Sequence, residues 1–94
     1  MKRDIILSFD MEPDIGSWTS DYKGMEQGAP ASLGILSAHQ VKTTFMYTGR
    51  EALAFPALAE CIAADGHEIG CHTVYHETLG QPVFSMPRDA PILE

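Results

Sequence analysis

Short apolar runs alternate with helix-like stretches along most of the chain. Three runs have the length and the β-branched or aromatic content of buried strands: 4–10, 41–47 and 68–72. The two stretches between them have the apolar spacing of helices: 30–39 and 50–64. This order of strand, helix, strand, helix, strand predicts an α/β fold with a parallel sheet and right-handed crossovers.

Proline and glycine set the expected ends of the helices. Pro30 suits the first position of the first helix. Pro56 is expected to divide 50–64 into a short turn and a second helix, and Gly66 suits the left-handed residue that ends that helix. The apolar residues that should face the core from these helices are Leu33, Ile35, Leu36, Leu58, Cys61 and Ile62.

Two stretches lack a regular pattern. Residues 12–28 form an expected long loop, interrupted by Pro13 and Gly16, and loops of this length are often functional. Residues 78–94 contain several prolines and are expected to form a loop or tail. With 94 residues, the chain is expected to form a single domain, 1–94.

Composition narrows the possible partners and compartment. A net charge of −7 disfavours nucleic acid and anionic membrane surfaces, and no stretch approaches the roughly 20 apolar residues that span a bilayer. The apolar run after Lys2 and Arg3 is too short for a signal peptide. Cys61 and Cys71 form no Cys-x-x-Cys pair, and we expect two buried free thiols. These features together predict a cytoplasmic protein.

Two histidines near the third predicted strand are candidate metal ligands. His72 and His76 are four residues apart, so both rings would point to the same spot if they lay in a helical turn. Two imidazoles suit a divalent cation such as Zn²⁺. A catalytic zinc site usually has three protein ligands, so a third ligand must come from elsewhere in the chain.

A carboxylate group at the end of the first predicted strand could supply that ligand. Asp10, Glu12 and Asp14 follow one another there at alternate positions. In parallel α/β folds, chemistry collects at the carboxyl ends of strands. The sequence therefore predicts a metal site that combines histidine and carboxylate ligands with a general base.

These residues lie within motifs that resemble a known family. The motifs are SFD at 8–10, KTTF at 42–45 with TG at 48–49, and GHEIGCHT at 66–73 followed by His76. Their order, across residues 4–77, resembles the polysaccharide deacetylase (NodB-homology) domain. The resemblance implies a metal-dependent amide hydrolase that removes N-acetyl groups from amino sugars. It also implies a distorted (β/α) barrel of about twice this length, of which this chain would be the N-terminal half.

The resemblance also implies residue roles. Asp10 matches the catalytic base that deprotonates a metal-activated water, and His72 and His76 match metal ligands. Many relatives have a second aspartate where this chain has Met11, but some family members place the acidic ligand two residues after the base. The carboxylate ligand is therefore expected to be Glu12, with Asp14 as the alternative. The cofactor would be a divalent metal, Zn²⁺ or also Co²⁺.

The expected substrate is an N-acylated sugar or a small N-acyl compound. Trp18 and Tyr22 could bind it, because aromatic faces pack on sugar rings, or they could fold back onto the barrel rim. The family's later motifs, including the general acid, are not found in this chain, so the other barrel half or a second copy of the chain would complete it. Two alternatives are a metal-independent cyclic amide or ureide hydrolase of the same fold and a non-catalytic module that binds carbohydrate or a partner chain.

Overall fold

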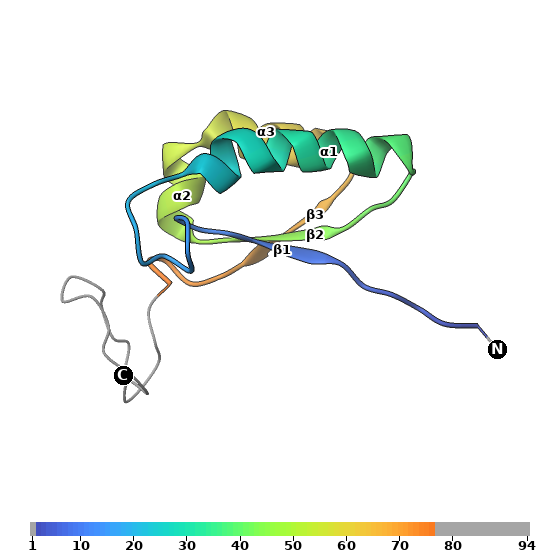
Figure 1. Ribbon diagram of the computed structural model, residues 1–94, viewed down its shortest axis with the longest axis horizontal. Coiled ribbons are helices and arrows are strands. Elements are labelled where there is room, and N and C mark those ends of the chain that lie inside the picture. Colours follow the sequence, from blue (N-terminus) through green and yellow to red (C-terminus); the bar gives the residue numbers. More distant parts are fainter. Residues whose placement is uncertain (1, 77–94) are drawn as a thin grey trace.

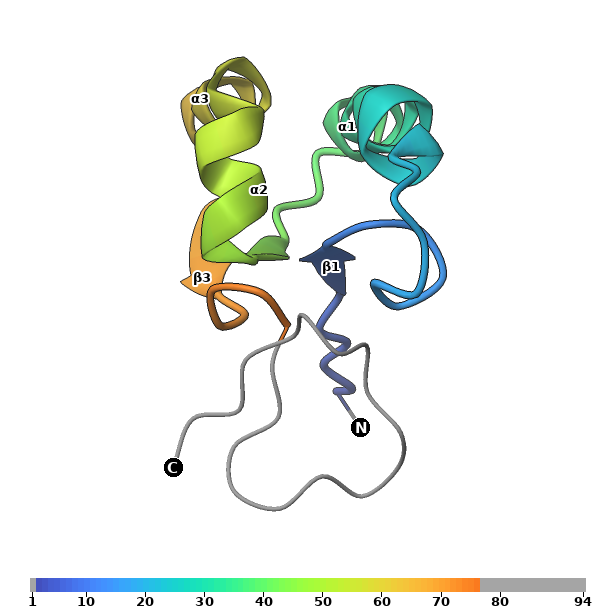
Figure 2. The same ribbon diagram turned by 90° about the vertical axis from the view of Figure 1, so that its left-hand side faces the viewer.

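The described part of the molecule has two layers, a three-stranded parallel sheet and the helices that cover one of its faces (Figures 1 and 2). The computed structural model describes residues 2–76. Its elements are β1 (Ser8–Met11), η1 (Gly24–Gly28), α1 (Ala29–Ala38), β2 (Thr44–Tyr47), α2 (Gly49–Ala54), α3 (Pro56–Ala64) and β3 (Glu68–Cys71). The strand order is β1-β2-β3 and both pairings are parallel. The predicted βαβαβ arrangement is therefore confirmed.

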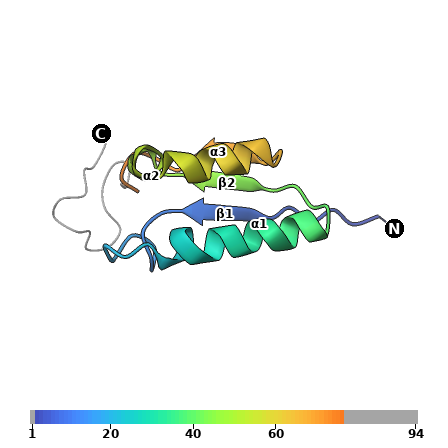
Figure 3. The ribbon, with the colours of Figure 1, turned by 90° about the horizontal axis from the view of Figure 1, so that it is seen from above.

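All three strands are parallel, so their carboxyl ends lie at one edge of the sheet. Figure 3 shows β1 and β2 pointing the same way. In the register, Phe9 lies beside Phe45 and Phe45 beside Ile69. The rings of Phe9 and Phe45 stack with their centroids 4.9 Å apart. Because side chains alternate along a strand, Met11 and Tyr47 face the helices together with these rings.

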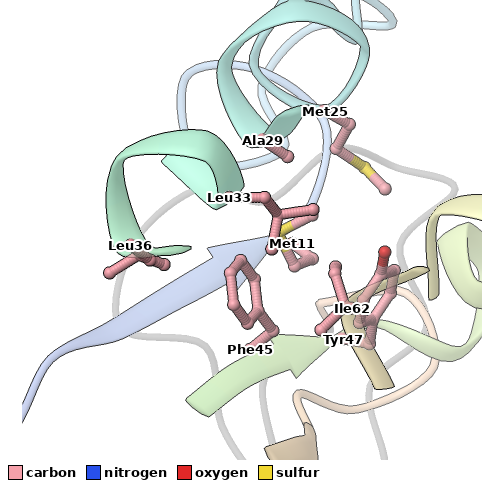
Figure 4. Packing of buried hydrophobic residues seen from close by; sticks show 8 residues of the cluster. All are labelled: Met11, Met25, Ala29, Leu33, Leu36, Phe45, Tyr47 and Ile62. Atoms are coloured by element: carbon pink, nitrogen blue, oxygen red, sulfur yellow. The ribbon is translucent and has the colours of Figure 1, made fainter. Parts of the chain in front are cut away.

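The core lies between this sheet face and the helices (Figure 4). Phe45 and Ile62 are completely buried. The other buried apolar residues are Met11, Met25, Ala29, Leu33, Leu36 and Tyr47. Two helix positions differ from the expected stripes, because Ile35 is 62% exposed and Cys61 is also exposed. Each of them lies on the side of its helix that no described element covers.

The two longer helices end in the same way. At the end of α3, Gly66 has a φ of 86° and its N–H donates to Ala63, while the N–H of His67 donates to Ile62. This is the Schellman motif, and it confirms Gly66 as the left-handed cap. At the end of α1, Gln40 takes the same position with a φ of 55°. After Gln40 the chain reaches β2 at Thr44, and after Gly66 it reaches β3 at Glu68.

The predicted boundaries of the first strand were wrong. Strand β1 contains only Ser8–Met11, and Ile5 and Ile6 are 85% and 89% exposed. Strand β2 begins at Thr44, whose N–H donates to the carbonyl of Leu7 at 3.4 Å, and residues 4–7 are not part of a strand. The expected loop 12–28 is also shorter, because its last five residues form η1, a π-helix that continues into α1.

Both cysteines are free and exposed, which corrects the expectation of buried thiols. Cys61 lies on the outer side of α3, and Cys71 lies in β3, an edge strand of the described sheet. The expected cytoplasmic location stays a prediction. Among residues 2–76, no helix has the length and apolar character needed to span a membrane. The expected tail at 78–94 lies outside the described residues.

We expect Tyr47→Phe to leave the fold intact and to increase its stability by about 1 kcal/mol, because a buried hydroxyl without a partner is costly. Within residues 2–76, the Tyr47 hydroxyl has no hydrogen-bond partner, and burial raises the pKa of Tyr47 from 10.0 to about 12. Between pH 10.0 and about pH 12, the Tyr47 hydroxyl therefore keeps its proton in the folded state and loses it in the unfolded chain. The free energy of unfolding should therefore fall as the pH rises from 10.0 to about 12.

Urea unfolding from neutral pH to about pH 12 would measure this effect. The drop should be smaller in Tyr47→Phe than in the unmodified protein. Tyr75→Phe is the matched control, because Tyr75 is 43% exposed, and this variant should keep the drop. An equal drop in Tyr47→Phe would show that Tyr47 does not cause it.

Candidate metal centre

The candidate ligands emerge from the two outer strands of the described sheet at the same edge. Glu12 directly follows β1, and His72 directly follows β3. The backbone N–H of His72 donates to the carbonyl of Tyr47 at 2.8 Å, so the ladder between β2 and β3 continues to the ligand itself. The parallel topology alone therefore brings two residues that are 60 positions apart to one place.

Three side-chain atoms converge at this edge. Glu12 Oε2 lies 3.1 Å from His72 Nε2 and 3.0 Å from His76 Nε2. The two imidazole rings are tilted against each other with centroids 4.7 Å apart. The Glu12 side chain is only 12% exposed, so its carboxylate is largely shielded from water. Among residues 2–76, these three form the group whose geometry could hold a metal ion.

An irregular turn brings the two histidines together. The expectation that they would lie in a helical turn was therefore wrong. Residues 72–76 are not helical, and Thr73 and His76 have positive φ values of 62° and 59°. The Thr73 hydroxyl donates to the carbonyl of His72 at 2.6 Å. Left-handed conformations are unfavourable for residues with a β-carbon, so neighbouring contacts must hold this turn.

Asp10 lies beside this group but outside it. Its Oδ2 atom is 3.9 Å from His72 Nε2, and its side chain is 57% exposed. Asp10 belongs to β1 and alternates with the buried Met11, so it points to the sheet face opposite the helices. The carboxylate is therefore accessible to water and adjacent to the histidines, as a general base would need to be.

Asp14, the alternative ligand, binds backbone N–H groups away from the two histidines. Its two carboxylate oxygens each accept a backbone N–H at 2.9 Å, one from Lys23 and one from Gly24. These donors lie at the start of η1, where helical N–H groups need acceptors. The structure thus brings Glu12, and not Asp14, to the two histidines.

The two aromatic candidates for substrate binding are separated. Tyr22 points inward, with its ring 5.0 Å from the ring of Phe55 and its hydroxyl donating to Glu51 at 3.1 Å. Trp18 is 54% exposed. A pocket beside the site is lined by Asp10, Glu12 and the loop as far as Gly16, and neither aromatic residue lines it. A role of Trp18 in binding substrate stays a prediction, whereas Tyr22 packs in the way expected of a rim residue.

A buried carboxylate near the site was not found from the sequence. Glu51, in the first turn of α2, is completely buried and accepts hydrogen bonds from Thr48, Arg50 and Tyr22. Burial alone would raise the pKa of Glu51, but these hydrogen bonds outweigh it and lower the pKa below its ordinary value. A signal was present, since a threonine followed three residues later by a glutamate is typical of a helix start.

The donor set fits a borderline divalent cation. Two neutral imidazole nitrogens and one carboxylate oxygen form a common catalytic zinc site, which leaves a position open. Ligand atoms around a tetrahedral zinc ion lie about 3.4 Å apart, given zinc–ligand distances of about 2.1 Å. The three atoms here lie within 4.8 Å of one another, which is compatible with that arrangement.

Comparisons with known proteins point to one family. Residues 1–89 match the model of the polysaccharide deacetylase family. A peptidoglycan-N-acetylglucosamine deacetylase of Bacillus cereus is 35% identical over 80 residues, which are 85% of this chain and 25% of that protein. The uncharacterized protein YlxY of Bacillus subtilis is 38% identical over 65 residues, which are 69% of this chain and 18% of that protein.

A solved structure shows the same similarity. The peptidoglycan deacetylase of Bdellovibrio bacteriovorus superposes with a TM-score of 0.53 at 26% identity, covering 82% of this chain and 18% of that one. The chain therefore spans a quarter or less of the length of each of these relatives.

We expect Glu12→Ala and Asp14→Ala to separate metal binding from local stability. Glu12→Ala should lose bound metal, as should His72→Ala, because each removes a converging donor atom. Asp14→Ala should retain the metal and lose about 1 kcal/mol of stability, because the start of η1 loses its acceptor. Elemental analysis and urea unfolding measure the two effects. Metal loss in Asp14→Ala with retention in Glu12→Ala would contradict this assignment.

Proposed function

This chain belongs to the polysaccharide deacetylase family, and we propose that it acts as a metal-dependent hydrolase that removes N-acetyl groups from an amino sugar. The family match and the three converging donor atoms support this proposal. The substrate class follows from the relatives, which include a peptidoglycan-N-acetylglucosamine deacetylase. In this proposal, the parallel sheet is the N-terminal part of a distorted (β/α) barrel.

Glu12, His72 and His76 would hold a divalent cation, with Zn²⁺ as the first candidate and Co²⁺ as a substitute. When bound, such a cation polarises an amide carbonyl and makes water more acidic. The single observation that carries the proposal is the approach of both Nε2 atoms to one oxygen of Glu12, at 3.1 and 3.0 Å. The partial burial of all three side chains strengthens electrostatic interactions there.

Asp10 would act as the general base. Its Oδ2 atom lies 3.9 Å from His72 Nε2, so a water molecule beside the histidines is within its reach. Proton transfer from that water to Oδ2 would accompany attack on the acetyl carbonyl carbon. The pocket lined by β1, the loop that follows it, η1 and α1 also includes Asp10 and Glu12, and it offers space for part of a substrate next to the base.

The leaving amine must receive a proton, and the other two histidines of the chain are not placed to give it. His67 is buried, and its Nδ1 atom accepts the backbone N–H of Thr43 at 3.1 Å. His39 ends α1, whose carboxyl end lies away from the carboxyl ends of the strands. We therefore expect the general acid to come from outside residues 2–76.

We expect the protein, once joined by the part that supplies the general acid, to release acetate from N-acetylglucosamine oligomers only when it carries metal. Chelation should abolish the activity, and Zn²⁺ or Co²⁺ should restore it. Asp10→Asn should lower turnover by about 10²- to 10⁴-fold while keeping the metal, because a general base contributes that much. Asp4→Asn is the matched control, because Asp4 is an exposed aspartate shortly before β1. This variant should behave like the unmodified protein.

Other outcomes would contradict this proposal in distinct ways. Turnover of cyclic amides that survives chelation would identify the metal-independent hydrolase. Oligomer binding without acetate release, sensitive to Trp18→Ala and insensitive to Asp10→Asn, would identify a binding module. Metal content measured in the same samples separates both results from simple loss of the ion.

A further inference from the structure

The start of α2 contacts both limbs of the candidate metal centre. The limbs are the backbone around Glu12, after β1, and the turn 72–76, after β3. Between them lies the end of β2, which leads directly into Thr48 and α2. A residue that fixes the position of the chain between β2 and α2 therefore influences the distance between the two limbs.

Thr48 fixes the limb that carries Glu12. It is completely buried, and its backbone N–H donates to the carbonyl of Met11 at 3.2 Å. Its hydroxyl oxygen also lies 3.2 Å from that carbonyl and close to a carboxylate oxygen of Glu51. Met11 directly precedes Glu12, so its carbonyl belongs to the peptide that carries the ligand. The position of Thr48 therefore sets where Glu12 leaves the sheet.

The next two residues fix the limb that carries the histidines. The N–H of Gly49 donates to the carbonyl of Thr73 at 2.9 Å, and the N–H of Arg50 donates to the carbonyl of Val74 at 3.0 Å. These are first-turn N–H groups of α2, which have no partner within their own helix. The turn uses them to hold its left-handed backbone between His72 and His76.

Arg50 adds a side-chain contact to the same turn. Its guanidinium lies over the ring of Tyr75, 5.5 Å from the ring centroid, which is within the range of a cation–π interaction. At the same time its Nε atom donates to Glu51 at 2.8 Å. The guanidinium of Arg50 thus lies at the start of α2, where it binds the carboxylate of Glu51 and also packs on the face of the Tyr75 ring.

Glu51 joins these contacts. It is completely buried and has three donors: Thr48 between β2 and α2, Arg50 from α2, and Tyr22 from the loop after β1. A buried carboxylate is stable only with such a full set of donors. One side chain therefore fixes the two residues that hold the two limbs.

We propose that Glu51 is a positioning residue for the metal centre. It holds Thr48 against the Glu12 limb and Arg50 against the histidine turn, and so it sets the spacing of the three donor atoms. This proposal rests on the metal-dependent function proposed above. It assigns Glu51 no contact with metal or substrate.

Co²⁺ binding to the intact protein tests this role, measured by competition with a chromophoric chelator and by the visible absorption of bound Co²⁺. Glu51→Gln keeps the size of the side chain, but a neutral amide cannot accept from all three donors. We expect about 10-fold weaker binding or more, with a shifted Co²⁺ spectrum, as for residues that orient metal ligands. Glu60→Gln removes the same charge from an exposed position of α3 and should change neither reading.

A second pair of variants covers the case in which Glu51→Gln fails to fold. Thr48→Val removes the hydroxyl at nearly constant size and should weaken Co²⁺ binding and shift the spectrum, while Thr48→Ser keeps the hydroxyl and should preserve both. Circular dichroism confirms folding of each variant. A purely structural role would lower the melting temperature but leave the affinity and spectrum of the folded protein unchanged.

The outcomes separate this proposal from the function on which it rests. Folded Glu51→Gln and Thr48→Val proteins with unmodified Co²⁺ affinity and spectrum would overturn the positioning role alone. An unmodified protein that binds no Co²⁺ would overturn the metal centre itself, and the positioning role with it. Weaker binding and a shifted spectrum in both variants, with Thr48→Ser and Glu60→Gln unchanged, would support it.

Discussion

The central strand β2 is the constraint on which the rest of the structure depends. It is hydrogen-bonded to β1 on one side and to β3 on the other, in parallel and in register. Neighbouring strands lie about 4.8 Å apart, so the ends of β1 and β3 are about 10 Å apart across β2. Glu12 and His72 are long enough to meet over the end of β2, and the chain that leaves β2 passes directly beneath them. The candidate metal centre and the start of α2 therefore both depend on the position of the end of β2.

The order of elements could be predicted because it depends on local patterns. Apolar runs predicted three strands, Pro56 predicted the break between two helices, and Gly66 predicted a left-handed cap, all of which the structure contains. The extent of β1 could not be predicted in this way. Ile5 and Ile6 are as apolar as a buried strand requires. Their burial, however, depends on whether another segment pairs with them or packs on them, and a local pattern does not reveal that.

The candidate site shows the same division. Residue types and spacing predicted His72 and His76 and a group of three carboxylates, and the family resemblance selected Glu12 from that group. The structure brings Glu12 and the two histidines together. The choice between Glu12 and Asp14 depended on which backbone N–H groups each carboxylate could reach, and the loop geometry decides that. Glu51 was missed for a related reason. A threonine and a glutamate three residues apart suggest a helix start, but here the two side chains bond to each other and the backbone groups bond to other segments.

The separation of 60 residues between Glu12 and His72 also has a consequence for how the protein is made. Glu12 follows β1 and His72 follows β3, so the donor set cannot assemble until β3 has added to the sheet. Closing such a long loop is slow compared with forming a helix, because its entropy is lost before the contact is gained. Binding of the proposed metal ion would thus follow the pairing of β3 with the sheet. Until then, these side chains would lie apart and could not retain the ion.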